Sequence, residues 1–441
     1  MNNEDFDIDD EQELEITEKP SRRMIDIERN VRERAILVAV RFKNQKREIV
    51  EEHSEELAEL ADTAGADVLF TIIQDRQNLD KAYFIGKGKA EEVATLVEEN
   101  KADLVIFDDD LGPVQVRNLE LMFKCKVVDR SGLILDIFAS RARSKEAKTQ
   151  VELAQLEYML PRLTRAWTHL SKQYGGIGTK GPGETQIETD RRLVRDRITM
   201  LKKKLDKIEE VRVLQTSGRE GLLRSALVGY TNVGKSTLFN LLTQESVLAE
   251  DKLFATLDST TRGFNLDKNL KILLSDTVGF IRKLPTHLVA SFKSTLNEVR
   301  ESDFILHIID ITHPFYEEQI RVVEDTLKEL GCEDKTQIKL FNKVDALEDK
   351  ERIEYVMNKY ENAVVISAAR GINLDAFFSL HKKLIEETFV STSLTLKASQ
   401  SKLIASIHHL TEVTSINYED DVVFIECKGN KKNIDKILAQ I

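Results

Sequence analysis

Eight residues, GYTNVGKS from Gly229 to Ser236, match the pattern GxxxxGK[ST] without a gap. Such a loop can hold phosphates, because its glycines allow backbone N–H groups to close around the phosphate oxygens. The ammonium of Lys235 would neutralise the β- and γ-phosphates, and the hydroxyl of Ser236 would bind Mg²⁺. A β-branched run precedes the loop and a helix-like run follows it, as this chemistry requires. The segment therefore predicts a nucleoside triphosphate site.

A second segment, LKILLSDTVGF, indicates a strand that ends at Asp276. The carboxylate of Asp276 is suited to hold a metal-bound water, and the backbone N–H of Gly279 to sense the γ-phosphate. Between Lys235 and Asp276 lies FATLDSTTRGF, which we interpret as a switch loop whose threonine reaches Mg²⁺ only when the γ-phosphate is present. Candidates are Thr256, Thr260 and Thr261; Thr256 is preferred, because the Phe–Ala before it is similar to other bacterial GTPase switches.

A third segment, KLFNKVDAL, is expected to determine which nucleotide base the site binds. Its Asp345 can accept two hydrogen bonds from the ring N–H and exocyclic amine of guanine, a pair of donors that adenine lacks. Ser367 and Ala368, in VVISAA, place backbone groups for the guanine oxygen. Ala369 stands where many GTPases have Lys, which loosens one face of the predicted pocket. Loop, carboxylate and base reader occur in the right order, so we predict a GTP hydrolase.

The predicted site can be written out in full. Catalytic roles fall to Lys235, Thr256 and Gly279, and the Mg²⁺ ligands are Ser236, Thr256 and, through water, Asp276. The residues expected at the nucleotide are Gly229, Tyr230, Thr231, Asn232, Val233, Gly234, Lys235, Ser236, Thr237, Phe254, Ala255, Thr256, Asp276, Thr277, Val278, Gly279, Asn342, Lys343, Asp345, Ser367, Ala368 and Ala369.

Two side chains at this site are unusual. Phe280 occupies the place of the glutamine that orients the attacking water in Ras-like enzymes, and a phenyl ring cannot do so. We therefore expect slow intrinsic hydrolysis, with a chain that only binds GTP as the alternative. The side-chain oxygen of Asn232 could bind K⁺ beside the phosphates, as in related GTPases. It could equally satisfy the local loop backbone, and the sequence leaves both open.

Upstream, residues 33–141 alternate short β-branched runs with helix-like runs. This alternation predicts a small parallel α/β domain. Within it, IGKGKAEEV sets Gly86 and Gly88 between a strand and a helix start, where a turn can hold a phosphate. A turn that only packs strand on helix is the more ordinary interpretation.

Residues 143–214 carry apolar seams at steps of three and four, which predicts two antiparallel helices. The first is expected to run from about Glu146 to Ser171 with a kink at Pro161. The glycine-rich GGIGTKGPGETQ lies between the two helices, and a simple connection would need only a few residues. We expect the tip and the stem of this arm to contact RNA. The expected RNA contacts are Lys172, Tyr174, Lys180, Arg191, Arg192, Arg195 and Arg197.

Charge is segregated along the chain. The net charge is −12, yet residues 1–20 carry nine acids and one lysine, while residues 141–207 carry sixteen Lys or Arg and eight Asp or Glu. The three cysteines are scattered and indicate neither a zinc site nor a disulfide framework. No run is long and apolar enough to cross a bilayer, and the acidic start is unlike a signal peptide. We expect a cytoplasmic monomer, with peripheral membrane association left open.

The expected divisions follow from these patterns. They are an acidic disordered tail at 1–30, the N-terminal α/β domain at 31–142, the basic arm at 143–215, a P-loop GTPase domain at 216–390 and a small α/β unit at 391–441. In the last part the runs predict a βαββα order, and we find no catalytic constellation there.

The combination of GYTNVGKST, FATLD, DTVGF, NKVD, GKGKAEEV and GGIGTKGPGETQIETDRR resembles the HflX family of translational GTPases over roughly residues 33–390. The resemblance implies binding to RNA of the large ribosomal subunit, with the arm near the peptidyl-transferase region. It also implies GTP-dependent splitting of stalled or idle ribosomes, followed by release on hydrolysis. Two other functions remain as alternatives: a GTP-regulated scaffold that pairs proteins through the helical arm, and an RNA-remodelling ATPase that acts through the N-terminal domain.

Overall fold

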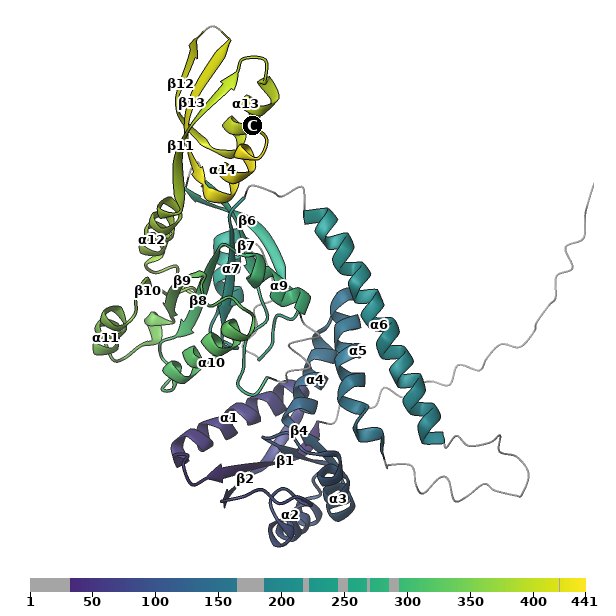
Figure 1. Cartoon of the computed structure of the whole chain (residues 1–441). Coiled ribbons are helices and arrows are strands. Elements are labelled where there is room, and N and C mark those ends of the chain that lie inside the picture. The colour runs from purple at the N-terminus through teal and green to yellow at the C-terminus, as the bar shows by residue number, and fades with distance from the viewer. Residues whose placement is uncertain are drawn as a thin grey trace, which may run out of the picture. The chain divides into compact units, whose positions relative to one another are not determined.

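The computed structural model describes residues 32–164, 186–216, 222–244, 253–267, 270–284, 293–419 and 421–441. Within them it contains a parallel four-stranded sheet, a mixed six-stranded sheet and an antiparallel three-stranded sheet, with a helical pair between the first two in sequence (Figure 1). The predicted class is confirmed: an N-terminal α/β domain, a helical arm, a P-loop GTPase domain and a small C-terminal α/β unit.

The N-terminal sheet has the strand order β2-β1-β3-β4, and all its strands are parallel. Its central strand is buried on both faces from Ala35 to Val40, as expected where helices cover both sides of a parallel sheet. Its elements are β1 (Glu33–Phe42), α1 (Arg47–Ala64), β2 (Ala66–Arg76), α2 (Lys87–Asn100), β3 (Leu104–Phe107), α3 (Pro113–Phe123), β4 (Lys126–Asp129) and α4 (Arg130–Arg141).

The arm consists of α5 (Lys145–Met159), a 3₁₀ turn (Arg162–Thr164) and α6 (Gln186–Thr216). The expectation that the first helix continues to about Ser171 with a kink is wrong as far as the described residues reach. The helix ends before Pro161, whose missing N–H and ring clash stop the ladder instead of bending it. The predicted seams do pack: Leu153 of α5 lies against Ile198 and Leu201 of α6.

The GTPase sheet has the order β10-β9-β8-β5-β7-β6, in which only β6 is antiparallel to its neighbour. Because parallel strands end at one edge, the loops after β5, β7 and β9 meet there. The elements are β5 (Arg224–Gly229), α7 (Lys235–Thr243), β6 (Thr260–Asp267), β7 (Leu270–Asp276), α9 (Lys293–Glu301), β8 (Phe304–Asp310), α10 (Tyr316–Glu329), β9 (Thr336–Asn342), a 3₁₀ turn (Val344–Ala346), α11 (Glu351–Lys359), β10 (Ala363–Val365) and α12 (Leu374–Glu387).

The C-terminal unit follows the predicted βαββα order. Its strands pair as β11-β13-β12, and both helices pack on one face of the sheet around a core that includes Ile407 and Ile425 (Figure 1). The elements are β11 (Phe389–Lys397), α13 (Ser401–Leu410), β12 (Glu412–Glu419), β13 (Val422–Asn430) and α14 (Lys431–Leu438). In the part of the chain that the structure describes, no helix is suited to span a bilayer.

Candidate functional site

The phosphate-binding loop connects β5 to α7, and two of its glycines are required by close contacts. A Cβ on Gly229 would lie 2.3 Å from the carbonyl oxygen of Ile308. Gly234 has φ 95° and is the N-cap of α7, and a Cβ there would lie 2.4 Å from Nδ2 of Asn342. Only glycine fits at both positions. The two glycines of the motif are therefore required by packing as well as by the approach of phosphate.

Lys235 is buried beneath this loop, and its ammonium donates to the carbonyl oxygens of Gly229 (3.2 Å) and Tyr230 (2.5 Å). Burial lowers the pKa of Lys235 to about 8, while the charge of Asp276 acts in the opposite direction. The ammonium is thus held by two neutral carbonyls at the base of the loop. Phosphate oxygens would be stronger partners for it.

Three side-chain oxygens converge beside Lys235. The hydroxyl of Ser236 lies 2.7 Å from Oγ1 of Thr256 and 2.8 Å from Oδ2 of Asp276. The second oxygen of Asp276 is buried and has no hydrogen-bond partner in the described residues. Burial raises the pKa of Asp276, so this carboxylate favours a nearby cation. Hydroxyl and carboxylate oxygens of this kind suit Mg²⁺, which the residues would hold partly through water.

The other two threonines of the predicted switch loop lie in strand β6. Thr261 is hydrogen-bonded through its hydroxyl to Ser275 at 2.8 Å, and Thr260 begins the strand. Thr256 is therefore the member of the three that the structure brings to Ser236. The cavity there is lined by Thr231, Asn232, Gly234, Lys235, Ser236, Thr237, Phe254, Ala255, Thr256, Thr277 and Gly279.

The segment after β7 is joined to the phosphate-binding loop by backbone hydrogen bonds. Thr231 N–H donates to the carbonyl of Phe280 at 2.9 Å, and Phe280 N–H donates to the carbonyl of Gly229 at 3.0 Å. A Cβ on Gly279 would lie 2.9 Å from Cα of Thr231, so glycine is needed for this approach. The ring of Phe280 is 2% exposed and packs in the sheet core, away from solvent.

The side chains of two neighbours in that segment contact the sheet and its core. The hydroxyl of Thr277 donates to the carbonyl of Leu227 at 2.6 Å, and Val278 is buried in the core.

Asn232 is exposed, with φ 62°, and lines the cavity.

The residues predicted to bind the base are held from several sides. Asn342 is buried; its Nδ2 donates to the carbonyl of Val233, and its Oδ1 accepts from the N–H of Ala368, both at 2.8 Å. It thereby joins the phosphate-binding loop to the loop that contains Ser367. Lys343 pairs with Asp310 at 2.7 Å.

Neighbouring side chains also contact the carboxylate of Asp345. A hydrogen bond from Ser367 is the main reason that its pKa lies below the ordinary value. Nε of Arg370 lies 3.1 Å from Oδ2 of Asp345. Arg370 was not predicted from the sequence; it supplies a cation one residue after Ala369, and its position next to VVISAA was the available signal.

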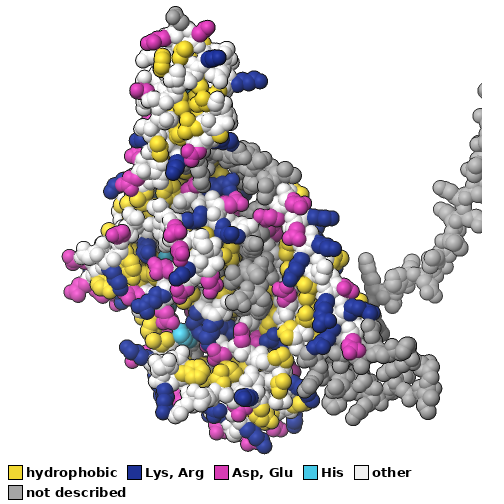
Figure 2. Space-filling view, in the orientation of Figure 1, with side chains coloured by type: hydrophobic (Ala, Val, Ile, Leu, Met, Phe, Trp, Pro, Cys, Tyr) yellow, Lys and Arg dark blue, Asp and Glu magenta, His cyan; other side chains and the backbone are white. Residues whose placement is uncertain are grey.

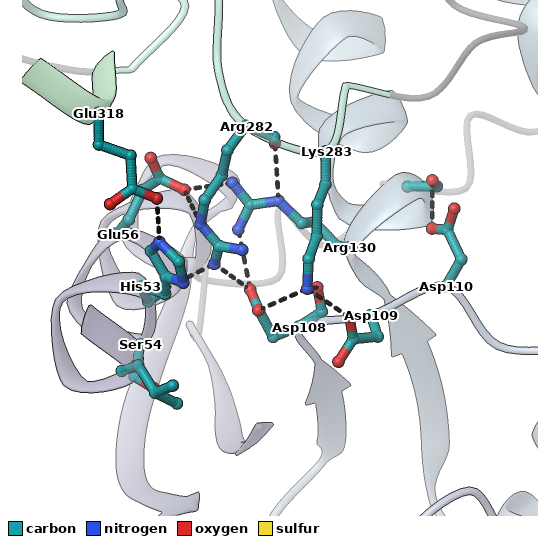
Figure 3. Close-up of polar contacts among 12 residues, drawn as sticks. His53, Ser54, Glu56, Asp108, Asp109, Asp110, Arg130, Arg282, Lys283 and Glu318 are labelled. Carbon is teal, nitrogen blue, oxygen red and sulfur yellow. Dashed lines mark hydrogen bonds and ion pairs between the residues drawn. The ribbon is translucent and has the colours of Figure 1, made fainter. Parts of the chain in front are cut away.

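A group of charges shown in Figure 3 was not predicted from the sequence, and we call it the Arg130 cluster: Glu56, Asp108, Arg130, Arg282 and Lys283. Asp108, Arg130 and Arg282 are buried, whereas Glu56 is partly buried and Lys283 is exposed. Asp108 follows β3 and accepts from Arg130 (3.0 Å), Arg282 (2.6 Å) and Lys283 (3.1 Å). Burial would raise the pKa of Asp108, but these three cations outweigh it and the pKa lies below its ordinary value. The cluster joins the N-terminal domain to the segment that follows Gly279.

Glu56 of α1 completes this connection. It is hydrogen-bonded to Arg130, and Nε of Arg282 lies 3.1 Å from its carboxylate. The hydroxyl of Tyr230, in the phosphate-binding loop, also donates to Glu56. The available signals were the FDDD run of residues 107–110 and the Arg–Lys pair after DTVGF, which carry opposite charge.

The predicted RNA contacts divide into two groups. Lys172, Tyr174 and Lys180 lie outside the described residues. Arg191, Arg192, Arg195 and Arg197 lie on α6, where Figure 2 shows Lys and Arg side chains along the helix. Arg197 is also paired with Glu152 of α5 at 2.5 Å, and so contributes to the stem itself.

The turn at Gly86 forms the N-cap of α2, and a Cβ there would lie 3.1 Å from the guanidinium of Arg76. No cluster of three or more His, Cys, Asp or Glu suited to a metal occurs in the described parts of the chain.

Three family models match the chain. They describe a GTP-binding GTPase N-terminal region (residues 51–139), a GTP-binding GTPase middle region (residues 141–219) and a 50S ribosome-binding GTPase (residues 224–343). Together they cover more than half of the sequence.

Curated relatives named GTPase HflX match over most of both chains. The protein of Flavobacterium psychrophilum is 46% identical over 375 residues, covering 80% of this chain and 90% of its own. The protein of Caldanaerobacter subterraneus is 48% identical, and the match covers 82% of this chain and 83% of its own. The protein of Escherichia coli K12 is 42% identical, and the match covers 88% of this chain and 91% of its own. Among solved structures, a GTP-binding protein from Sulfolobus solfataricus in complex with GDP is 25% identical. The match covers 80% of this chain and 98% of that chain, with a TM-score of 0.42.

Proposed function

Since the chain belongs to the HflX family of GTPases and hydrolyses GTP, we propose that it binds the large ribosomal subunit and dissociates stalled or idle ribosomes. GTP would order the switch segments for splitting, and hydrolysis would drive release of the factor. The protein would act as a monomer in the cytoplasm, where ribosomes are found.

The observation that carries this proposal is the arm. A simple helical hairpin would need a connection of only a few residues, whereas more than twenty residues separate the 3₁₀ turn at Arg162–Thr164 from α6. The stem presents exposed arginines, including Arg192 and Arg195, on α6. A basic stem with a long glycine-rich tip suits RNA, because cations bind phosphates and glycines allow close backbone approach.

We assign the chemistry at the nucleotide to residues that the structure brings together. Lys235 would exchange its two carbonyl partners for the β- and γ-phosphates, and Gly279 N–H would bind the γ-phosphate. Ser236, Thr256 and, through water, Asp276 would hold Mg²⁺, which neutralises charge on the phosphates. Asp345, with Ser367, Ala368 and Arg370 around it, would bind guanine.

Hydrolysis alone should be slow, because the ring of Phe280 is buried and cannot orient water. Large subunits should accelerate it. If the oxygen of Asn232 binds a monovalent cation, turnover should be faster in K⁺ than in Na⁺; equal rates in the two salts would support the purely structural role for Asn232.

The test replaces residues 174–184 with a short Gly-Ser linker and measures GTP binding and ribosome splitting separately. We expect near-normal GTP binding with splitting lost. Splitting at the wild-type rate would show that the tip is only a connector.

A second variant, Arg192→Gln with Arg195→Gln, should weaken pelleting with large subunits, and the loss should grow with salt because the contacts are ionic. Lys350→Gln, on the exposed surface of the GTPase domain, is the matched control. Pelleting that depends on neither salt nor the stem would favour the alternative of a protein-pairing scaffold.

A further inference from the structure

The switch loop is joined directly to the base of the arm through Asp258. Its Oδ2 accepts hydrogen bonds from the backbone N–H groups of Arg143 and Ser144, both at 3.2 Å. Its Oδ1 accepts from the hydroxyl of Ser144 at 2.5 Å. One carboxylate of the GTPase domain therefore binds three donors at the start of the arm.

Ser144 is the N-cap of α5. Its hydroxyl oxygen accepts from the N–H of Ala147 at 3.0 Å while its proton goes to Asp258. The first N–H groups of a helix have no partner in the helix itself, and its N-terminus attracts negative charge. Asp258 supplies that charge from outside the arm, so the start of α5 depends on where the switch loop lies.

The switch loop is also fixed to α4, the helix before the arm. The ring of Phe254 packs edge-on against Phe138, with centroids 4.7 Å apart. Phe254 has φ 54°, a left-handed conformation that bulky residues rarely adopt, and Leu257 is buried in the same core. The switch loop thus contacts α4 of the N-terminal domain through Phe254, and the start of the arm through Asp258.

Thr256 lies between these two anchors, two residues before Asp258. Its hydroxyl is 2.7 Å from that of Ser236, at the oxygens suited to Mg²⁺. Movement of Thr256 relative to α7 must be taken up by a chain that is fixed at Phe254 and at Asp258. The most direct path to the arm is the three hydrogen bonds of Asp258.

We propose that Asp258 is a positioning residue that couples the nucleotide bound beside Thr256 to the orientation of α5, and hence of the arm. The inference rests on the proposed function in taking the arm as the part that binds a partner. Because coupling between two sites is reciprocal, a partner that fixes the arm would also change the affinity for GTP relative to GDP.

The test is amide hydrogen exchange of the full chain, with saturating GDP or a non-hydrolysable GTP analogue, read at residues 143–150. The wild type should show at least about a fivefold difference in exchange between the two nucleotides, a coupling in the usual range. In Asp258→Ala that difference should disappear. A residue that only stabilised the helix would raise exchange equally with both nucleotides and leave the difference in place.

Three further variants complete the experiment. Ser144→Thr keeps both the cap and the donor and should retain the difference, whereas Ser144→Ala should reduce it. Asp325→Ala, an exposed carboxylate on α10, is the matched control and should behave as the wild type. The proposal is overturned if the wild type shows no difference, or if the difference survives in Asp258→Ala. Amide hydrogen exchange is measured without ribosomes. If the protein did not split ribosomes, the proposed function would be wrong, but the coupling through Asp258 would still be tested by the exchange data.

Discussion

The hydroxyl of Tyr230 donates a hydrogen bond to Glu56 and accepts one from the backbone N–H of Arg282 at 2.9 Å. One phenol oxygen therefore joins the phosphate-binding loop, the segment after Gly279 and helix α1. Burial raises the pKa of Tyr230 well above its ordinary value, so the hydroxyl keeps its proton over the physiological range. This contact adds to the backbone hydrogen bonds of Phe280 that join the segment after β7 to the phosphate-binding loop.

Tyr230→Phe should raise the affinity for GTP relative to GDP. Without the hydroxyl, Arg282 N–H loses its buried acceptor, and the segment leaves the phosphate-binding loop more easily to admit a γ-phosphate. A buried hydrogen bond of this kind contributes about 1–2 kcal/mol, which corresponds to about a five- to thirtyfold change in the ratio of dissociation constants. Titration with labelled GTP and GDP measures it.

Tyr355→Phe is the control for this experiment, because it removes an exposed hydroxyl that binds Glu317 within the GTPase domain. An unchanged ratio in Tyr230→Phe would show that the tyrosine contact does not restrain the segment.

Asp345→Asn should change the preferred base. The variant loses the acceptor for the two guanine donors, so GTP affinity should fall by about two orders of magnitude or more, and xanthosine triphosphate should become competitive. Competition binding with both nucleotides measures the change, and Asp349→Asn on the neighbouring loop should have no effect. If the wild type bound ATP as well as GTP, the assignment of Asn342 and Asp345 to the base would be wrong.

Phe280 should matter for stability and not for the chemical step. Phe280→Ala leaves a cavity in the sheet core and should cost about 3–5 kcal/mol, while Phe280→Leu keeps most of the volume and should cost less. Intrinsic hydrolysis by the folded fraction should stay near the wild-type rate in both. Urea unfolding and single-turnover hydrolysis on the same samples separate the two effects; a steep loss of turnover in stable Phe280→Leu would assign the ring a role in catalysis.

Acid should destabilise the GTPase domain through two buried histidines. Burial lowers the pKa of His307 to about 3 and that of His381 to about 4, from an ordinary value near 6.5. Below pH 6.5 the unfolded chain binds protons that the folded chain does not, so stability falls as pH decreases. Each histidine contributes roughly 1.4 kcal/mol per pH unit, until the pH reaches its folded value.

Urea unfolding at several pH values from 7.5 to 5 measures this slope. His381→Gln should remove about half of it, even though the substitution lowers stability overall, and exposed His408→Gln should leave the slope unchanged. A slope that persists in the double variant of His307 and His381 would have to come from other groups.

The local parts of the site were predictable because they follow one another in sequence. The loop from Gly229 to Ser236 and the strand end at Asp276 carry their chemistry in a few adjacent residues. Contacts between distant segments left no such pattern: Tyr230 meets Glu56 across 174 positions, and Asp258 meets Ser144 across 114. Asp258 belongs to the FATLD motif, yet nothing in that motif indicates a helix start as its partner.

The fold shows the same division. Heptad spacing predicted the packing of α5 on α6, but helix α4 was missed. Its run SGLILDIFAS is apolar on nearly every side, because every residue from Leu133 to Phe138 except the exposed Asp136 is buried, so it lacks the one-sided period of a surface helix. At Pro161 the residue type alone could not decide between a kink and an end.

The arm also has a mechanical consequence. Helix α6 has 31 residues, so at about 1.5 Å per residue it is about 46 Å long. A rigid rod of that length amplifies small angles: a tilt of about 5° at one end displaces the other by about 4 Å, roughly the rise of two to three helical residues. Shifts at Asp258 too small to alter the packing of the GTPase sheet would therefore reach the far end of the stem as displacements of atomic size.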